Sequence, residues 1–148
     1  MMADELRAED CPFCKIATGV AAAKKVFESE EVLAFLPVHP AVVGHTLVIP
    51  KRHIRDLWHL DAETSATIME AVLVVAKGIK IALAPEGINL INSSGEAASQ
   101  TVFHLHMHLV PRWAGDRMGA IWPPDQSWPE GQREALAKRI HEGVNSVT

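Results

Sequence analysis

The chain has 148 residues, of which 48% are hydrophobic and 22% charged, as expected for a globular domain with its own apolar core. Its net charge of -4 and pI of about 6.0 argue against binding to long nucleic acid, because such proteins cluster positive charge. The apolar run at residues 71–76 is far shorter than the ~20 residues of a membrane-spanning helix, so no membrane partner is expected.

The first ten residues carry four acidic side chains and no long apolar stretch, so they do not resemble a signal peptide. The chain has only two cysteines, whereas a secreted disulfide scaffold normally carries more. We therefore expect a cytoplasmic protein. No internal repeat or linker is visible, so we expect one domain over residues 1–148, with a core at about 11–122 and a C-terminal extension at about 123–148.

Three short strands are predicted in the first third of the chain. Residues 25–28 and 32–36 are separated by the polar residues 29–31, which indicates a hairpin. Residues 46–49 form a third apolar and β-branched run, which Pro50 ends. These strands would supply one half of a sheet.

A long helix is predicted over residues 62–83, with Asp61 as its N-cap. Apolar residues recur along it at steps of three and four, at Ile68, Val72, Val75, Ile79 and Leu83. Such a stripe would pack on a sheet. Pro85 and Gly87 follow and end the helix.

Two further strands are predicted at residues 88–91 and 102–110, joined by the polar loop 92–100. A final amphipathic helix at about 130–144 follows the Trp- and Pro-rich segment 122–129. The order of strands, helix, strands and helix indicates an α+β domain with a mainly antiparallel sheet of about five strands.

Three histidines alternate with apolar residues in the segment His104-Leu105-His106-Met107-His108. In a strand, residues two apart point to the same face, so the three imidazoles share one face and the apolar residues the other. The apolar residues are suited to packing under the long helix. Three imidazoles are costly to bury unless each ring nitrogen finds a partner, so this pattern indicates chemistry.

Two chemical interpretations of the histidine row compete. Alternate histidines could bind zinc, or one imidazole could attack a phosphoryl group while its neighbours hold the phosphate oxygens. The preceding loop offers hydroxyl, amide and backbone donors that suit an anion: Ser93, Gly95, Ser99, Gln100 and Thr101. The isolated histidines His39, His59 and His141 show no such pattern, and we expect them to be exposed or satisfied locally.

The row His104 to Val110 resembles the His-x-His-x-His signature of the histidine-triad (HIT) nucleotide-binding and hydrolase superfamily. Residues 11–16 (CPFCKI) resemble the opening of that family, residues 44–53 (GHTLVIPKRH) its central strand, and residues 100–103 (QTVF) the segment before the triad. The resemblance covers most of the chain. It implies a compact HIT-like α+β fold and a homodimer with one active site in each subunit.

The resemblance also implies a mechanism. His106 is the expected nucleophile, whose Nε2 attacks the α-phosphorus of a nucleotide and forms a nucleotidyl-histidine that water hydrolyses. The free base is well populated at neutral pH because the ordinary pKa of histidine is ~6.5. His108 and His45 are expected to assist at the phosphate. The expected substrate-binding residues are Ser93, Ser99, Gln100 and Thr101 near the phosphate and Val38 near the base.

One position departs from the family pattern. After Ala34-Phe35-Leu36, many relatives carry an acidic residue that binds the ribose hydroxyls, whereas this chain has Pro37. Proline offers no side-chain acceptor and no N–H. Ribose recognition would then depend on backbone carbonyls or on another group.

The Cys-x-x-Cys pair has three interpretations: a zinc site, a redox pair or an inert local motif. A redox pair usually follows a strand, and no strand is predicted before Cys11. The resemblance to a bacterial zinc-containing branch of the family implies a structural Cys2His2 site made by Cys11, Cys14, His53 and His104. Four protein ligands would leave no open position, so the zinc would not be catalytic.

The tail from Arg112 to Trp122 resembles that of bacterial HIT proteins described as diadenosine-polyphosphate hydrolases. The leading expectation is hydrolysis at the α-phosphate of a dinucleoside polyphosphate or a nucleoside phosphoramidate. Arg112 and Arg117 would meet distal phosphates or be solvated. Two other functions stay open: a nucleotide-binding interaction module, favoured by Trp122 and Trp128, and nucleotidyl transfer or phosphorolysis.

Overall fold

The computed structural model describes residues 9–148, so most of the acidic N-terminal segment lies outside the described residues. The helices are α1 (Pro12–Ala17), α2 (Ala62–Leu83) and α3 (Glu130–Val147). The strands are β1 (Lys24–Glu28), β2 (Val32–Leu36), β3 (Thr46–Pro50), β4 (Gly87–Asn92) and β5 (Met107–Arg112). Single 3-10 turns occur at Leu57–His59 (η1) and Glu96–Ala98 (η2). No helix in this described range is long and apolar enough to cross a membrane.

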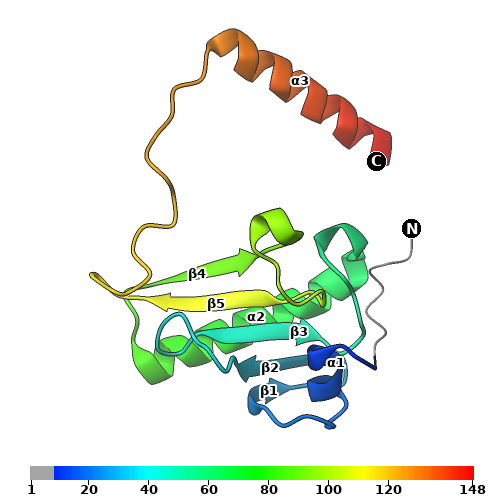
Figure 1. Cartoon of the computed structure of the whole chain (residues 1–148), viewed down its shortest axis with the longest axis vertical. Coiled ribbons are helices and arrows are strands. Elements are labelled where there is room, and N and C mark those ends of the chain that lie inside the picture. Colours follow the sequence, from blue (N-terminus) through cyan, green and yellow to red (C-terminus); the bar gives the residue numbers. More distant parts are fainter. Residues whose placement is uncertain (1–8) are drawn as a thin grey trace.

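The five strands form one antiparallel sheet in the order β1-β2-β3-β5-β4, which confirms the predicted α+β class. Helix α2 connects β3 to the edge strand β4, and the chain then returns as β5 between them (Figure 1). In this register Thr46 pairs with Leu109, and Asn92 pairs with Met107. The sheet therefore brings the histidine row beside the start of β3.

The two faces of the sheet are covered by different helices. Alternate residues of the strands and of the segment before β5 pack with α2 in one cluster: Val32, Ala34, Val48, Leu105, Met107 and Leu109. The intervening residues pack with α1 in a second cluster: Leu33, Phe35, Leu47 and Ile49. This is the period of two that strand side chains follow, and it confirms that the apolar residues of the histidine row lie under the long helix.

The predicted strand at 102–110 is wrong at its start, because β5 begins only at Met107. The Leu105 N–H donates to the carbonyl of Ile54, at 2.6 Å, in the loop after β3. Residues 101–106 are thus held by loop groups outside the strand ladder. The side chains still alternate, since Leu105 lies in the α2 cluster while His104 contacts Cys11.

Helix α2 has the predicted bounds, and the Asp61 carboxylate accepts from the Thr64 N–H at 2.8 Å. Helix α3 extends to Val147, three residues beyond the prediction, and every one of its residues is exposed. It lies apart from the sheet in Figure 1. The short helix α1 was not predicted, although Cys11 caps it and Pro12 occupies its first turn, a position that proline favours.

Candidate active site and metal centre

The N-terminus of α1 places the two cysteines side by side. Cys11 is the N-cap residue, and its sulfur accepts from the backbone N–H of Cys14 at 3.4 Å. Both cysteines are buried free thiols. A capping residue and the residue three positions later lie on the same turn, so both sulfurs face the same way.

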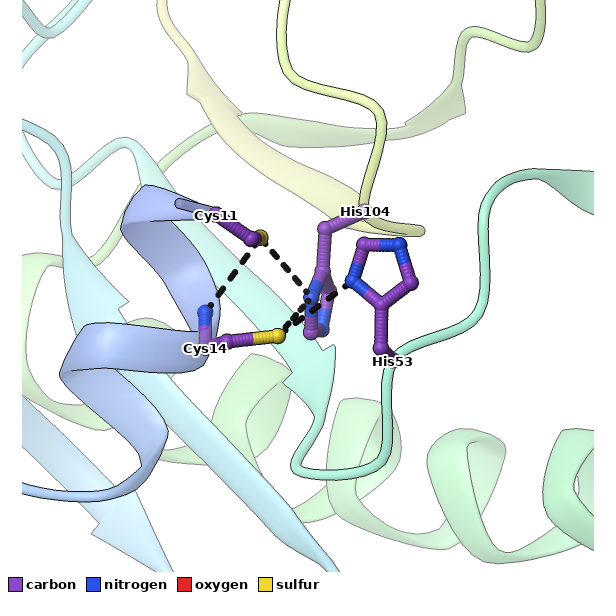
Figure 2. Close-up of side chains that lie close together, drawn as sticks. All are labelled: Cys11, Cys14, His53 and His104. Carbon is purple, nitrogen blue, oxygen red and sulfur yellow. Dashed lines mark hydrogen bonds between the residues drawn. The ribbon is translucent and has the colours of Figure 1, made fainter. Parts of the chain in front are cut away.

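Two histidines from distant parts of the chain complete this cluster, which we call the Cys/His cluster (Cys11, Cys14, His53 and His104). Figure 2 shows both sulfurs and both rings directed toward one common space. The sulfur of Cys14 lies 3.3 Å from Nδ1 of His53 and 3.4 Å from Nδ1 of His104. All four ligand atoms lie within 4.8 Å of one another.

These distances fit a tetrahedral zinc. Bond lengths of ~2.3 Å to sulfur and ~2.0–2.1 Å to nitrogen give a sulfur-to-nitrogen edge of about 3.5 Å. The observed edges match that value, and the donors are the two thiols and two imidazoles that zinc prefers. The predicted ligand set is therefore assembled in space and could hold a metal.

The ring orientation of His104 prepares it for a metal. Its Nε2 lies 2.7 Å from the carbonyl oxygen of Pro50, so that nitrogen must carry the proton and Nδ1 presents a lone pair to the sulfurs. Burial lowers the pKa of His104 to about 4 and thus keeps the ring neutral. Burial also raises the pKa of the Cys14 thiol to about 12, and the neighbouring Cys11 adds to this. A bound cation would reverse this preference and favour the thiolate.

The next histidine has the opposite tautomer. Nδ1 of His106 lies 2.7 Å from the carbonyl oxygen of His104, so Nδ1 carries the proton and Nε2 holds the lone pair. Burial lowers the pKa of His106 below its usual value. The free Nε2 is therefore available at neutral pH as a nucleophile.

His45 and His108 form a hydrogen-bonded pair in which the tautomer of each ring is defined. The Ala41 N–H donates to Nδ1 of His45 at 3.0 Å, so the proton of neutral His45 is on Nε2. Nε2 of His45 then donates to Nδ1 of His108 at 2.9 Å. The proton of neutral His108 is consequently on its own Nε2, which leaves one N–H donor for an anion. Burial lowers the pKa of His108 to about 4, and His106 and His45 add to this effect.

The structure brings the three expected catalytic side chains together, and we call them the imidazole cluster (His45, His106 and His108). The ring centres of His106 and His108 are 4.8 Å apart, and those of His45 and His108 are 5.2 Å apart. His45 directly precedes β3, and β3 pairs with β5 at His108. A ring with a free lone pair therefore lies next to a ring with a free donor N–H, an arrangement that can support attack on a phosphoryl group.

A cavity of about 880 Å³ lies beside the imidazole cluster. Its walls include His45 and Thr101 together with apolar side chains from α1, β2 and the β2–β3 loop. Val38, which is 88% exposed, lies in this wall, as does Pro37. The cavity is large enough for a nucleotide-sized ligand.

The side-chain amide of Gln100 bonds to backbone groups, whereas it was expected to donate to a phosphate. Its Nε2 donates to the carbonyls of Arg55 and Val102, and its Oε1 accepts from the Gly95 N–H at 2.8 Å. The buried amide therefore braces the loop before the histidine row. Ser99 is exposed with a left-handed backbone (φ 72°), and Ser93 is half-buried; their predicted substrate contacts stay predictions.

Arg112 is not a solvated surface charge, and its expected contact with distal phosphates stays a prediction. Its guanidinium donates to both carboxylate oxygens of Asp116, at 2.7 and 3.0 Å, and to the side chain of Asn89 at 2.8 Å. It also donates to the carbonyl of Gly119. These bonds tie the turn after β5 to the edge strand β4. This role could not be read from the sequence, and neither could that of Phe13, whose ring contacts both His104 and His106.

Comparison with known proteins gives consistent relatives. The family model of the HIT domain matches residues 18–115. The crystal structure of a HIT family protein from Bacillus anthracis is 42% identical, covers 91% of this chain and 97% of its own, and gives a TM-score of 0.83. A Zn-bound histidine triad family protein from Mycobacterium smegmatis is 34% identical, covers 95% of this chain and 99% of its own, and gives a TM-score of 0.71.

One similar protein has a named activity. The adenosine 5'-monophosphoramidase hnt1 of Schizosaccharomyces pombe is 37% identical over 131 residues, which cover 88% of this chain and 95% of the relative. The resemblance noted in the sequence is thereby confirmed over the whole of the sheet and α2.

Proposed function

The chain belongs to the HIT-domain family, and we propose that it is a nucleotide hydrolase that attacks the α-phosphate of an adenosine nucleotide. The observation that carries this proposal is the set of tautomers in the imidazole cluster. His106 offers a free Nε2, and His108 offers an N–H beside it. A nucleophile next to a donor for the developing oxyanion is the arrangement that phosphoryl attack needs.

The proposed reaction has two steps. Nε2 of His106 forms a bond to the α-phosphorus while the bond from phosphorus to the leaving group breaks. Water then attacks the nucleotidyl-histidine, which releases the nucleoside monophosphate and a proton and returns the free imidazole. The carbonyl of His104 holds the Nδ1 proton throughout, and the N–H of His108 stabilises charge on the phosphate oxygens.

The cavity and the relative with a named activity support the proposed substrate class. The apolar wall at Val38 suits a base, and Thr101 and His45 line the same cavity. Pro37 supplies no carboxylate for the ribose, so backbone carbonyls of the β2–β3 loop are the proposed acceptors. We propose a dinucleoside polyphosphate or a nucleoside phosphoramidate as substrate, and the S. pombe relative supports the second.

The Cys/His cluster is proposed to hold a structural zinc. Cys11, Cys14, His53 and His104 would be its four ligands, and the Zn-bound relative from M. smegmatis supports this assignment. A zinc with four protein ligands crosslinks distant segments and has no position for a substrate. It would tie α1 to the segment before β5.

A substrate panel tests the proposal. Purified protein and His106→Asn are compared on diadenosine polyphosphates and on adenosine 5'-monophosphoramidate, with water or inorganic phosphate as acceptor. We expect release of AMP by the wild type and a loss of at least about 1,000-fold in kcat for His106→Asn, because asparagine cannot form the intermediate. Trapped nucleotidyl-protein that disappears in His106→Asn would identify the covalent step.

Two other outcomes of the panel would contradict hydrolysis. Nucleotide binding without turnover on any substrate would favour an interaction module, for which the 84% exposed Trp122 is the best support. Turnover only with inorganic phosphate would indicate phosphorolysis. The predicted homodimer stays a proposal; the exposed side chains of Ile88 and Leu90 on the edge strand β4 support it, and light scattering would test it.

A further inference from the structure

We infer that Asn92 is a positioning residue for His106. Asn92 is the last residue of β4, and it pairs with Met107 at the end of the sheet ladder. Its side-chain Nδ2 donates to the carbonyl oxygen of His106 at 3.0 Å. The amide therefore extends the ladder by one bond, at the residue where the backbone ladder stops.

The orientation of the Asn92 amide is set by a neighbour. The Leu57 N–H donates to the hydroxyl oxygen of Ser94 at 2.9 Å, so the hydroxyl uses its own proton elsewhere. That proton goes to Oδ1 of Asn92 at 2.8 Å. With Oδ1 accepting from Ser94, the NH2 group of Asn92 must face the carbonyl of His106. A chain of three bonds thus runs from η1 through Ser94 and Asn92 to His106.

This chain matters because it acts on the peptide group of His106 itself. Residues 101–106 lie outside the ladder, and bonds to Ile54 and Pro50 hold the neighbours Leu105 and His104. The ring of His106 donates to the carbonyl of His104. Asn92 holds the carbonyl on the other side of the same residue. His106 is consequently fixed at its ring and at its own peptide group, which together set where Nε2 points.

This inference is an addition to the proposed function, because it concerns how the proposed nucleophile is aimed. Asn92→Asp tests it directly, since aspartate has the same shape but no N–H and would place an oxygen against a carbonyl oxygen. Asn89→Asp is the matched control on the same strand. The Asn89 side chain accepts from Arg112, and a carboxylate accepts equally well.

We expect Asn92→Asp to lower kcat by about 10- to 100-fold with less than a threefold change in KM, because the cavity walls are unchanged while the nucleophile is misaligned. Asn89→Asp should keep kcat within twofold of the wild type. Ser94→Ala should lower kcat about three- to tenfold, since it frees the amide to turn, and Ser94→Thr should restore it. Thermal unfolding of each variant shows whether it is folded.

A second measurement does not depend on turnover. Long-range proton–nitrogen NMR spectra of labelled imidazoles report which ring nitrogen of His106 is protonated. We expect Nδ1–H alone in the wild type and in Asn89→Asp, and a mixture of tautomers in Asn92→Asp. If the wild type shows no turnover but Asn92→Asp still changes the tautomer of His106, the positioning role is upheld and the proposed function is rejected. An unchanged kcat, or an unchanged tautomer with only a lower melting temperature, would overturn the positioning role.

Discussion

The Cys/His cluster and the imidazole cluster meet at His104 and His106, which are two residues apart in the sequence. These two histidines have opposite tautomers. His104 gives its Nε2 proton to the carbonyl of Pro50 and presents Nδ1 to two sulfurs. Nδ1 of His106 donates to a backbone carbonyl, which leaves the lone pair on Nε2. The carbonyl that each ring meets therefore decides which of its two nitrogens keeps a lone pair.

The largest expected effect separates the two clusters by stability. Cys11→Ser should reduce zinc from about one per chain to a small fraction and should cost several kcal/mol of folding free energy, because zinc binding at structural sites contributes directly to folding. His106→Asn should keep both the zinc and the melting temperature. Metal analysis of protein purified without chelator, followed by thermal unfolding, measures both. Substoichiometric zinc that Cys11→Ser does not change would refute a metal role for this cluster.

The next expected effect concerns pH and the imidazole cluster. Burial lowers the pKa of His108 to about 4, whereas unfolded histidine titrates at ~6.5. Below pH ~6.5 this histidine therefore binds a proton in the unfolded chain but stays neutral in the folded protein. The free energy of unfolding consequently falls as the pH drops toward 4. The charged or titratable groups facing it here are His45 and His106.

His108→Asn removes this contribution and should lose less stability over the same pH range, by at most about 1.4 kcal/mol per pH unit. Denaturant unfolding at pH 4.5 to 7 measures the difference between the two slopes. Zinc content is measured in the same samples, because acid also competes for the Cys/His cluster. Parallel slopes in wild type and variant would show that His108 does not carry the acid sensitivity.

The smallest expected effect concerns Phe13, whose ring contacts one histidine of each cluster. The ring of Phe13 makes edge contacts with His104 and His106, with centres 5.9 and 5.2 Å away. Phe13→Leu should cost about 1 kcal/mol of stability and lower kcat by less than about tenfold, because both rings gain freedom. Phe27→Leu is the control for lost packing alone, because Phe27 is a partly buried residue that packs against the cluster under α2. Equal kcat in the two variants would show that Phe13 only fills space.

The order of the five strands, helix α2 and helix α3, and the four residues of the Cys/His cluster, could be predicted from the sequence, because they follow from local patterns and recognisable motifs. Helix α2 begins and ends as predicted. The start of β5 could not be predicted, since alternation at residues 102–106 persists although the Leu105 N–H is bonded to Ile54 instead of a strand. Alternation reports where side chains point, and it does not report which backbone groups pair.

Long-range side-chain bonds were equally hidden from the sequence. Gln100 was expected to touch phosphate, whereas the folded loop uses its whole amide internally. Arg112 was expected to contact distal phosphates or to be solvated, and its pairing with Asp116 was not foreseen, because Asp116 comes within reach only when the turn after β5 forms. Asn92 carried one weak signal, an asparagine at a predicted strand end followed by serines.

His104 links the two clusters mechanically. Its ring belongs to the Cys/His cluster, while its backbone carbonyl accepts the hydrogen bond from Nδ1 of His106. Any displacement of the ring would therefore move the carbonyl that fixes the tautomer of His106. Alkylation of Cys14 is a poor way to cause that displacement, because the thiol is buried, its pKa is raised to about 12, and the thiolate is the reactive form. The burial that places the sulfurs beside the histidine rings thus also shields the tautomer of His106 from electrophiles.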